Sequence, residues 1–301
     1  MDETVADPLS AARLQVAAPF GPGYLSGQGC RIELDRPRIM GILNVTPDSF
    51  SDGGEHQSLE RAVTRAHQMV AEGADLIDIG GESTRPGAPA VSVQQELDRV
   101  LPVLQALQGV IGVPLSVDTN KSFVARAALA DGAAFINDVS GLTFDPEMAQ
   151  VVAESDAGLF VMHTRGRPET MQGDTVYADL LGEVIGGLRR SVQMARDAGV
   201  TADRIAVDPG IGFGKDLDGN LLLLRRLAEL GTLGQPILLG TSRKSFLGRI
   251  LGQEDPHKRQ AGSLATVALG VAAGASFFRV HDVAASRDAA LTAWAICQAE
   301  A

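Results

Sequence analysis

Short apolar runs alternate with longer amphipathic segments along most of the chain. The runs are aliphatic almost throughout and do not alternate between apolar and polar positions, a pattern typical of parallel strands that are buried on both faces. Eight such strands are predicted, at residues 38–44, 74–80, 114–119, 134–138, 158–163, 204–208, 236–240 and 276–280.

The segments between the runs repeat their apolar residues every three or four positions, which is the spacing of an amphipathic helix. Several of them end at a glycine just before the next strand, at Gly73, Gly132 and Gly274. Glycine is the usual residue immediately after a helix. Helices are therefore predicted at residues 58–72, 93–107, 121–130, 177–198, 217–230 and 262–273.

The alternation of eight strands with helices predicts an α/β fold, a (β/α)8 TIM barrel. The strand ends recur about every 34 residues, close to the roughly 30 that a βαβ unit needs. The alternative is a doubly wound open sheet, which usually carries a GxGxxG fingerprint after its first strand. Here the first strand continues into NVTPDSF, so the barrel is favoured.

One domain is predicted, over residues 31–301. Within it, residues 31–34 (RIEL) are predicted to form a short extra strand that closes the bottom of the barrel. Residues 1–30 are rich in Ala, Gly and Pro and have no periodicity, so they are predicted to be a poorly ordered N-terminal extension.

Composition and charge exclude several classes of partner. The formal charge of −11 argues against a nucleic-acid surface, which needs a basic face. No apolar run approaches the roughly 18 residues of a membrane span, and the acidic start MDETVADPLS lacks the features of a signal peptide. Cys30 and Cys297 fit no metal or disulfide pattern. A cytoplasmic protein without nucleic-acid or membrane partners is expected.

Polar side chains follow the predicted strands one after another, where a barrel enzyme carries its reacting groups. Each has an ordinary explanation by itself, because Asp or Asn after a strand often caps the next helix. Their convergence on one rim favours a binding site instead. They are Asn44, Asp78, Glu82, Asp118, Asn137, His163, Asp208, Ser242, Arg243, Lys244, Arg279 and His281.

Part of this rim complements a flat heterocycle with an amino-pyrimidinone edge. Asp118, Asn137 and Asp208 offer oxygen acceptors for N–H groups, and Lys244 offers a donor for a carbonyl oxygen. The stretch GIGFGK, residues 210–215, fits neither nucleotide-loop pattern and is interpreted as a loop that lets backbone approach a ligand. The histidines have no zinc-like spacing, and Met162 suits either the core or a pocket wall.

Another part of the rim suits a phosphate group. Arg279 and His281 are two residues apart after the last strand, so their side chains face the same way. Barrels commonly bind phosphate near this strand, and arginine makes bidentate phosphate contacts. Asn44 offers a neutral oxygen of the kind that a phosphate-bound Mg²⁺ accepts.

The motifs that carry these residues are ILNVTPDSFSDGG, DIGGESTRPGA, SVDT, INDVSG, DPGIGFGK, GTSRKSFLG and RVHDV. In this order, and from about residue 38 to residue 294, the chain resembles the dihydropteroate synthases of bacterial folate biosynthesis. The resemblance implies a (β/α)8 barrel, usually a homodimer. It also implies a reaction that joins (7,8-dihydropterin-6-yl)methyl diphosphate to 4-aminobenzoate, giving dihydropteroate and diphosphate.

The resemblance also implies roles for individual residues. Asp52, Arg85 and Lys244 are expected to be catalytic, and Asn44 to contact Mg²⁺. Asp52 would meet the positive charge that develops on the pterin or position the incoming amine, within a mobile lid formed by TPDSFSDGG. The expected substrate contacts are Thr84, Asp118, Asn137, Asp208, Phe213, Lys244, Ser245, Arg279 and His281, with Pro86 beside them in the second loop.

One loop departs from the family pattern. Residues 163–172 read HTRGRPETMQ, whereas Met and Gln usually follow the His. Two other functions stay open at this point. A pterin-dependent methyltransferase with a corrinoid partner shares the fold and the pterin-binding acids, although it should lack TPDSFSDGG and SRKS. A non-catalytic paralogue would keep the barrel without the reaction.

Overall fold

Eight parallel strands form a closed barrel in the computed structural model, which describes residues 21–46, 55–85 and 87–299. Their order is β8-β7-β6-β5-β4-β3-β10-β9, and a parallel bridge between Val207 and Ile237 joins the two ends. The predicted barrel is confirmed, and an open sheet is excluded. The strands are β3 (Arg38–Asn44), β4 (Leu76–Gly80), β5 (Leu115–Asp118), β6 (Phe135–Asp138), β7 (Gly158–Met162), β8 (Ile205–Asp208), β9 (Leu238–Leu239) and β10 (Phe277–Val280).

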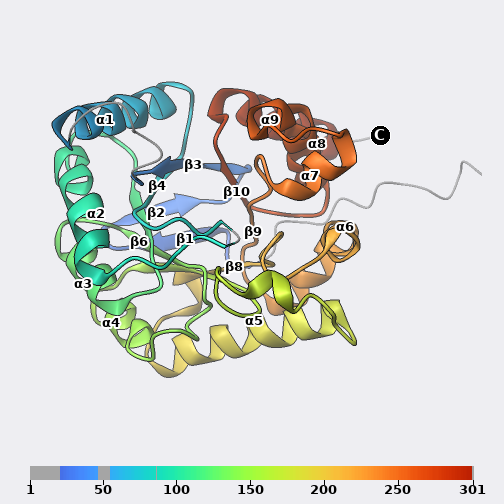
Figure 1. Cartoon of the computed structure of the whole chain (residues 1–301), viewed down its shortest axis with the longest axis horizontal. Helices are drawn as coiled ribbons and strands as arrows, with labels where there is room; N and C mark the ends of the chain where they lie inside the picture. The colour runs from blue at the N-terminus through green and yellow to red at the C-terminus, as the bar shows by residue number, and fades with distance from the viewer. Residues whose placement is uncertain (1–20, 47–54, 86, 300–301) are drawn as a thin grey trace, which may run out of the picture.

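Helices surround the strands as an outer ring (Figure 1). Their apolar faces and the outer faces of the strands form one large core. The α-helices are α1 (Glu55–Ala71), α2 (Val93–Leu107), α3 (Ser122–Ala130), α4 (Met148–Glu154), α5 (Leu180–Asp197), α6 (Leu217–Arg225), α7 (Ser245–Leu251), α8 (Gln260–Ala272) and α9 (Val283–Gln298). Short 3-10 helices are η2 (Met171–Gly173), η3 (Ala202–Arg204), η4 (Leu227–Leu233) and η5 (Pro256–Arg259).

A second, smaller core fills the inside of the barrel at its N-terminal end. Phe160 is central to it, with ring centroids 5.8 Å from Phe135 and 5.3 Å from Phe277. A hairpin of β1 (Tyr24–Gly27) and β2 (Cys30–Glu33) covers this end and buries Leu25 against the aromatic rings. This core is the floor under any ligand that enters from the opposite end.

The hairpin corrects the predicted domain boundary. The strand expected at residues 31–34 exists and closes the bottom of the barrel, but its partner begins at Tyr24, inside the segment assigned to the extension. Gly27 allows this close approach, because a Cβ there would lie 2.6 Å from the Ala134 carbonyl oxygen. The expected disorder of residues 1–20 concerns residues outside the described part of the chain.

Two predicted helices have different bounds. The helix expected from residue 177 begins at Leu180, because the Asp179 side chain accepts a hydrogen bond from the Gly182 N–H (3.1 Å) and caps it. The helix expected at residues 217–230 ends at Arg225, and a 3-10 helix follows. There Arg226 pairs with Glu229, three residues on (2.6 Å), which suits the tighter turn. The helices α4 and α9 were not predicted.

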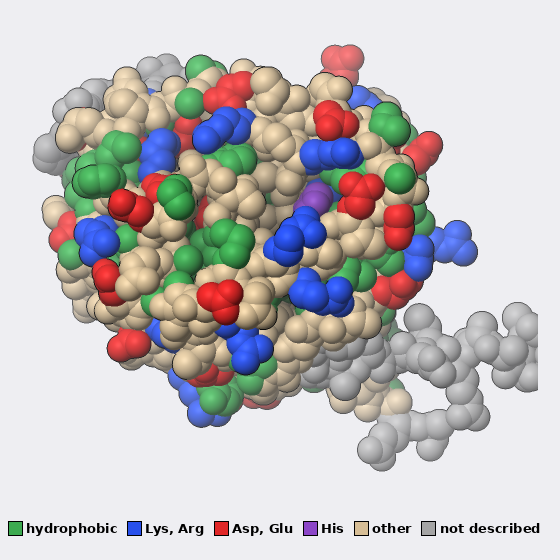
Figure 2. All heavy atoms as spheres, turned by 90° about the horizontal axis from the view of Figure 1, so that it is seen from below, with side chains coloured by type: hydrophobic (Ala, Val, Ile, Leu, Met, Phe, Trp, Pro, Cys, Tyr) green, Lys and Arg blue, Asp and Glu red, His purple; other side chains and the backbone are tan. Residues whose placement is uncertain are grey.

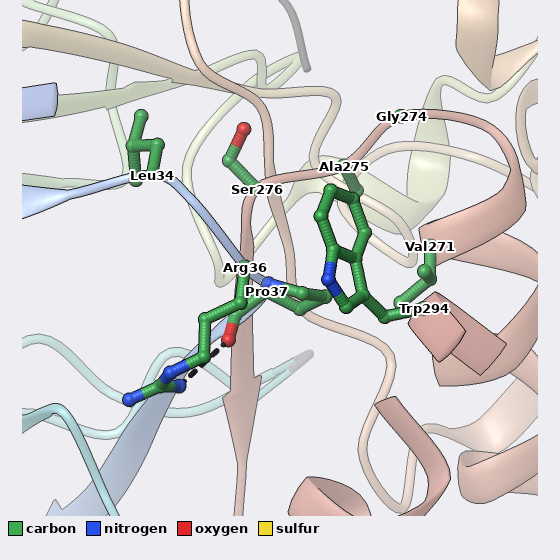
Figure 3. Close-up of a pocket in the computed structure, with 8 residues that line it drawn as sticks. All are labelled: Leu34, Arg36, Pro37, Val271, Gly274, Ala275, Ser276 and Trp294. Carbon is green, nitrogen blue, oxygen red and sulfur yellow. Dashed lines mark hydrogen bonds between the residues drawn. The ribbon is translucent and has the colours of Figure 1, made fainter. Parts of the chain in front are cut away.

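On the face drawn in Figure 2, the described residues of the outer surface show no strong segregation of charge. Figure 2 shows positive and negative side chains interspersed over one face. A small hollow at the bottom of the barrel, between Arg36 and Trp294, is drawn in Figure 3. The guanidinium of Arg36 is already engaged there by the Pro37 carbonyl (3.0 Å) and by Asp75 (2.7 Å). Among the described helices, none is long and apolar enough to cross a membrane.

Candidate active site

A pocket opens at the C-terminal end of the barrel, above the aromatic floor. It brings together residues from strand ends and loops that are far apart in the chain, including most of the predicted binding residues. The side chains and backbone that line it are those of Ile42, Asn137, Val139, Met162, Asp208, Phe213, Gly240, Ser242, Lys244, Arg279 and His281. Met162 is therefore a pocket wall.

Asp208, at the end of β8, faces this pocket and is only 6% exposed. One of its oxygens, Oδ1, accepts a hydrogen bond from the Gly210 N–H (2.7 Å). A Cβ at Gly240 would lie 3.7 Å from the other oxygen, Oδ2, so the glycine keeps the space beside it open. Burial raises the pKa of Asp208, and the nearby charge of Lys244 opposes this shift.

Lys244 reaches the pocket from a tightly held turn after β9. The preceding Arg243 has a left-handed backbone (φ 59°), which is strained for a residue with a side chain. Its N–H donates to the Ser263 hydroxyl (2.9 Å), and its guanidinium pairs with Asp282 (2.5 Å). These contacts hold Arg243 in place and thereby direct the next side chain towards the pocket.

The amine of Lys244 lies among a carbonyl, a ring and a carboxylate. Its Nζ donates to the Ile211 carbonyl and lies 4.3 Å from the centroid of the Phe213 ring. Burial lowers the pKa of Lys244 to about 8, although the charge of Asp208 opposes the shift. Lys244 therefore offers a hydrogen-bond donor whose charge is easily lost.

The GIGFGK loop carries Phe213 into the pocket and is anchored from behind. Lys215 is 3% exposed, and its Nζ lies 2.8 Å from the Phe213 carbonyl oxygen, 3.2 Å from that of His163 and 3.1 Å from His163 Nδ1. Burial lowers the pKa of Lys215 to about 7 and that of His163 to about 3. His163 thus stays neutral and supports the loop, instead of lining the pocket as expected.

Arg279, in β10, and His281, just after it, both line the pocket, but each already has a partner. Arg279 Nε donates to Asp78 (2.6 Å), and Nη2 donates to Asp118 (2.7 Å). Nδ1 of His281 lies 3.0 Å from the Ser242 hydroxyl, and burial lowers the pKa of this imidazole to about 3. The guanidinium is therefore held rigidly by carboxylates at the floor of the site.

Asp118 and Asp78 complete the polar floor. Asp118 is 6% exposed, and burial raises its pKa against the opposing charge of Arg279. Asp78, which the sequence placed on the rim without a specific role, is fully buried. Its signal in the sequence is a charge inside the apolar strand ADLIDIG, two residues before the strand ends.

The other predicted residues surround the mouth of the pocket. Asn44 ends β3, and its Oδ1 lies 3.4 Å from the position that a Cβ on Gly80 would take. Thr84 is half-buried and Arg85 is exposed, and the charge of Arg85 contributes to the lowered pKa of His281. Ser245 is the exposed first residue of α7.

Some expectations concern residues that the structure does not describe. Asp52, Pro86 and the proposed lid, apart from Thr46, lie outside the described residues. In the part of the chain that is described, no cluster of three or more His, Cys, Asp or Glu side chains suits a metal ion.

The atypical loop after β7 packs around Tyr177 and the GIGFGK loop. Arg165 lies 4.5 Å from the centroid of the Tyr177 ring and pairs with Asp174 (3.0 Å). Gln172 donates to the Gly212 carbonyl (2.8 Å), and Tyr177 donates to that of Gly214 (2.9 Å). Residues 164–172 of this loop therefore support the pocket from outside and do not line it.

Comparisons with known proteins agree with this geometry. Residues 40–281 match a family described as pterin binding enzyme. A dihydropteroate synthase of Synechocystis is 50% identical over 271 residues, which cover 90% of this chain and 94% of that protein. A solved dihydropteroate synthase of Xanthomonas albilineans, with 4-aminobenzoic acid, has a TM-score of 0.87 at 46% identity and covers 92% of this chain and 99% of its own. The solved dihydropteroate synthase of Yersinia pestis, in a sulfonamide drug complex, has a TM-score of 0.86 at 42% identity. The match covers 92% of this chain and 100% of that one.

Proposed function

The chain belongs to the dihydropteroate synthase family of pterin-binding enzymes, and from this premise we propose that it joins (7,8-dihydropterin-6-yl)methyl diphosphate to 4-aminobenzoate. The amine nitrogen forms a bond to the pterin methylene carbon, and the bond from that carbon to the diphosphate oxygen breaks. The amine loses one proton, and the products are 7,8-dihydropteroate and diphosphate. This transferase reaction belongs to folate biosynthesis.

The observation that carries the proposal is the meeting of Asn137, Asp208 and Lys244 in one cavity. A pterin presents N–H donors beside a carbonyl oxygen along its amino-pyrimidinone edge. The free oxygens of Asp208 and Asn137 accept from the N–H groups, and Lys244 donates to the carbonyl. Because these groups are nearly buried, a ligand with the wrong pattern would leave them unpaired.

The remaining contacts follow from the positive charges of the pocket and the residues at its mouth. Arg279, His281 and Arg85 would receive the diphosphate, since the positive charge of Arg85 reaches His281 and arginine suits phosphate oxygens. Ser245 and Lys244 would receive 4-aminobenzoate. The solved relatives that contain 4-aminobenzoic acid and a sulfonamide support this second subsite.

We propose that Mg²⁺ accompanies the diphosphate, with Asn44 as its protein ligand. The donor set fits this role, because Asn44 offers a neutral oxygen beside a glycine, Gly80, that leaves room. Mg²⁺ typically takes one or two protein oxygens and fills its remaining positions with waters and substrate phosphates. When bound, it would neutralise charge on the departing diphosphate.

We further propose that the chain works as a homodimer in the cytoplasm. Apolar side chains are exposed on neighbouring helices, with Ile250 52% and Leu251 42% exposed on α7 and Leu269 67% exposed on α8. Such a patch is typical of a protein–protein interface. Cys30 and Cys297 are both free, as is usual in a reducing compartment.

Release of diphosphate tests the proposed reaction and its alternatives. We expect release to require both substrates, to stop when a chelator removes Mg²⁺, and to resume when Mg²⁺ is returned. A sulfonamide should inhibit, and added 4-aminobenzoate should relieve the inhibition. Tight pterin binding without any diphosphate release would identify a non-catalytic paralogue, and release that ignores 4-aminobenzoate would contradict the placement of the second substrate.

A further inference from the structure

Asp78 is a fully buried carboxylate that does not line the pocket. It lies on β4 and faces the interior of the barrel, in the layer between the aromatic floor and the cavity. Burying a carboxylate is costly unless it is paired and hydrogen-bonded. Its partners should therefore show what the carboxylate contributes.

Three neighbours donate hydrogen bonds to Asp78. Its Oδ1 accepts from the Ser116 hydroxyl (2.6 Å), and its Oδ2 accepts from Asn137 Nδ2 (3.0 Å) and from Arg279 Nε (2.6 Å). The partners come from β5, β6 and β10. Two of them, Asn137 and Arg279, line the pocket that Asp78 itself does not reach.

The contact with Asn137 decides which end of that amide faces the ligand. An asparagine side chain has a donor end and an acceptor end of nearly the same shape, so either end fits a pocket sterically. The Oδ2 of Asp78 that contacts Asn137 also accepts a hydrogen bond from Arg279 Nε (2.6 Å), so this oxygen serves as an acceptor. Asp78 must therefore receive the NH₂ end of Asn137, which leaves Oδ1 for the cavity.

We propose that Asp78 is a positioning residue that makes Asn137 a hydrogen-bond acceptor and thereby selects ligands with an N–H group at that point. The inference rests on the proposed function and deepens it, because it names what sets the polarity of one pterin contact. Asp78 acts only through Asn137 in this role. A residue that merely stabilised the barrel would not control the polarity of the pocket.

The substitution Asp78→Leu tests this role, because it removes both carboxylate oxygens with little change in side-chain size. The NH₂ group of Asn137 would then lose its acceptor on Asp78, and Asn137 Oδ1 would no longer be fixed towards the cavity. The amide would be free to turn its NH₂ end to the cavity and face the ligand N–H donor to donor. We expect the affinity for 7,8-dihydropterin, measured by calorimetry, to fall roughly 5- to 100-fold. Dihydropterin is used without its diphosphate so that contacts between Arg279 and phosphate do not contribute to the measured affinity.

A double-mutant cycle separates positioning from general stabilisation. If Asp78 acts through Asn137, Asp78→Leu combined with Asn137→Ala should bind dihydropterin within about twofold of Asn137→Ala alone. If the fold-losses of affinity of the two single variants multiply in the double variant, the two residues act independently, and the proposal is overturned. Ser116→Ala is the matched control, because it removes a hydrogen bond to Asp78 without touching Asn137, and it should keep the affinity within about twofold.

A measurement on the unaltered chain covers the case in which Asp78→Leu fails to fold. The side-chain NH₂ of Asn137, assigned by its loss in Asn137→Ala, should exchange slowly with solvent in the ligand-free protein because Asp78 holds it. Fast exchange would overturn the proposal. Unaltered pterin affinity in a folded Asp78→Leu variant would also overturn it, while leaving the proposed function intact. Failure of the unaltered chain to bind any pterin would overturn the proposed function and the inference together.

Discussion

Asp208 is expected to recognise the ligand through one carboxylate oxygen. Its Oδ1 is held by the Gly210 N–H, and its Oδ2 faces the cavity. Asp208→Ala should weaken pterin binding by about 1–3 kcal/mol, the cost of leaving a buried N–H of the ligand without an acceptor. Calorimetry measures this directly. Asp203→Ala, in η3 just before β8, is the control and should bind pterin normally; equal affinity for both variants would remove Asp208 from the site.

Lys244 predicts a pH dependence of binding. Its pKa is lowered to about 8 by burial, so the ammonium form that donates to the pterin carbonyl is lost as the pH rises through that value. Pterin affinity should therefore fall between about pH 7 and pH 9. Lys244→Arg keeps its charge throughout this window and should not show the same fall. Ionisation of the ligand affects both proteins equally, so identical pH profiles would rule out the role of Lys244.

Sequence reasoning placed Asn137, Asp208 and Lys244 on one rim, because a barrel brings its strand ends and the loops after them together, and the structure brings these three residues to one pocket. The sequence placed Asp78 on the same rim, whereas in the structure Asp78 is fully buried and does not line the pocket. Sequence reasoning also did not foresee the pairing of Lys215 with His163, since no local pattern records a contact between residues 52 positions apart.

At the scale of elements, strands were predicted better than helix ends. Strands in a barrel are apolar because both faces are buried, so their pattern is strong. Asp179 caps the start of α5, and α6 gives way to a 3-10 helix at Arg226, which pairs with Glu229; neither feature leaves a strong apolar pattern. The strand expected at residues 236–240 shrinks to Leu238–Leu239, since Pro236 has no N–H for the sheet.

The first loop after β3 carries the sharpest prediction about an element. Asp52 belongs to TPDSFSDGG and lies outside the described residues, so its role rests on the sequence. Asp52→Ala should lower turnover roughly 10²- to 10³-fold, as removal of a preorganised transition-state group does, while pterin affinity stays within a few fold. Turnover, affinity and melting temperature should be measured on the same sample. A lower melting temperature with normal turnover per folded molecule would show that Asp52 only caps a turn.

At the scale of the whole molecule, the apolar patch on α7 and α8 predicts self-association. Leu269→Asp should give a monomer in analytical ultracentrifugation, because a carboxylate in an apolar interface is costly to desolvate. Phe123→Asp is a suitable control, since Phe123 is comparably exposed (70%) on α3, away from that patch. A dimer that persists in Leu269→Asp would place the interface elsewhere.

The most direct test of the proposed activity is the identity of its product. The chain should be incubated with dihydropterin diphosphate, Mg²⁺ and 4-aminobenzoate labelled with ¹⁵N in its amine, and the products weighed by mass spectrometry. We predict 7,8-dihydropteroate that carries the label, because the aromatic amine nitrogen forms the new bond. Consumption of both substrates without labelled dihydropteroate, or recovery of both unchanged, would contradict the account.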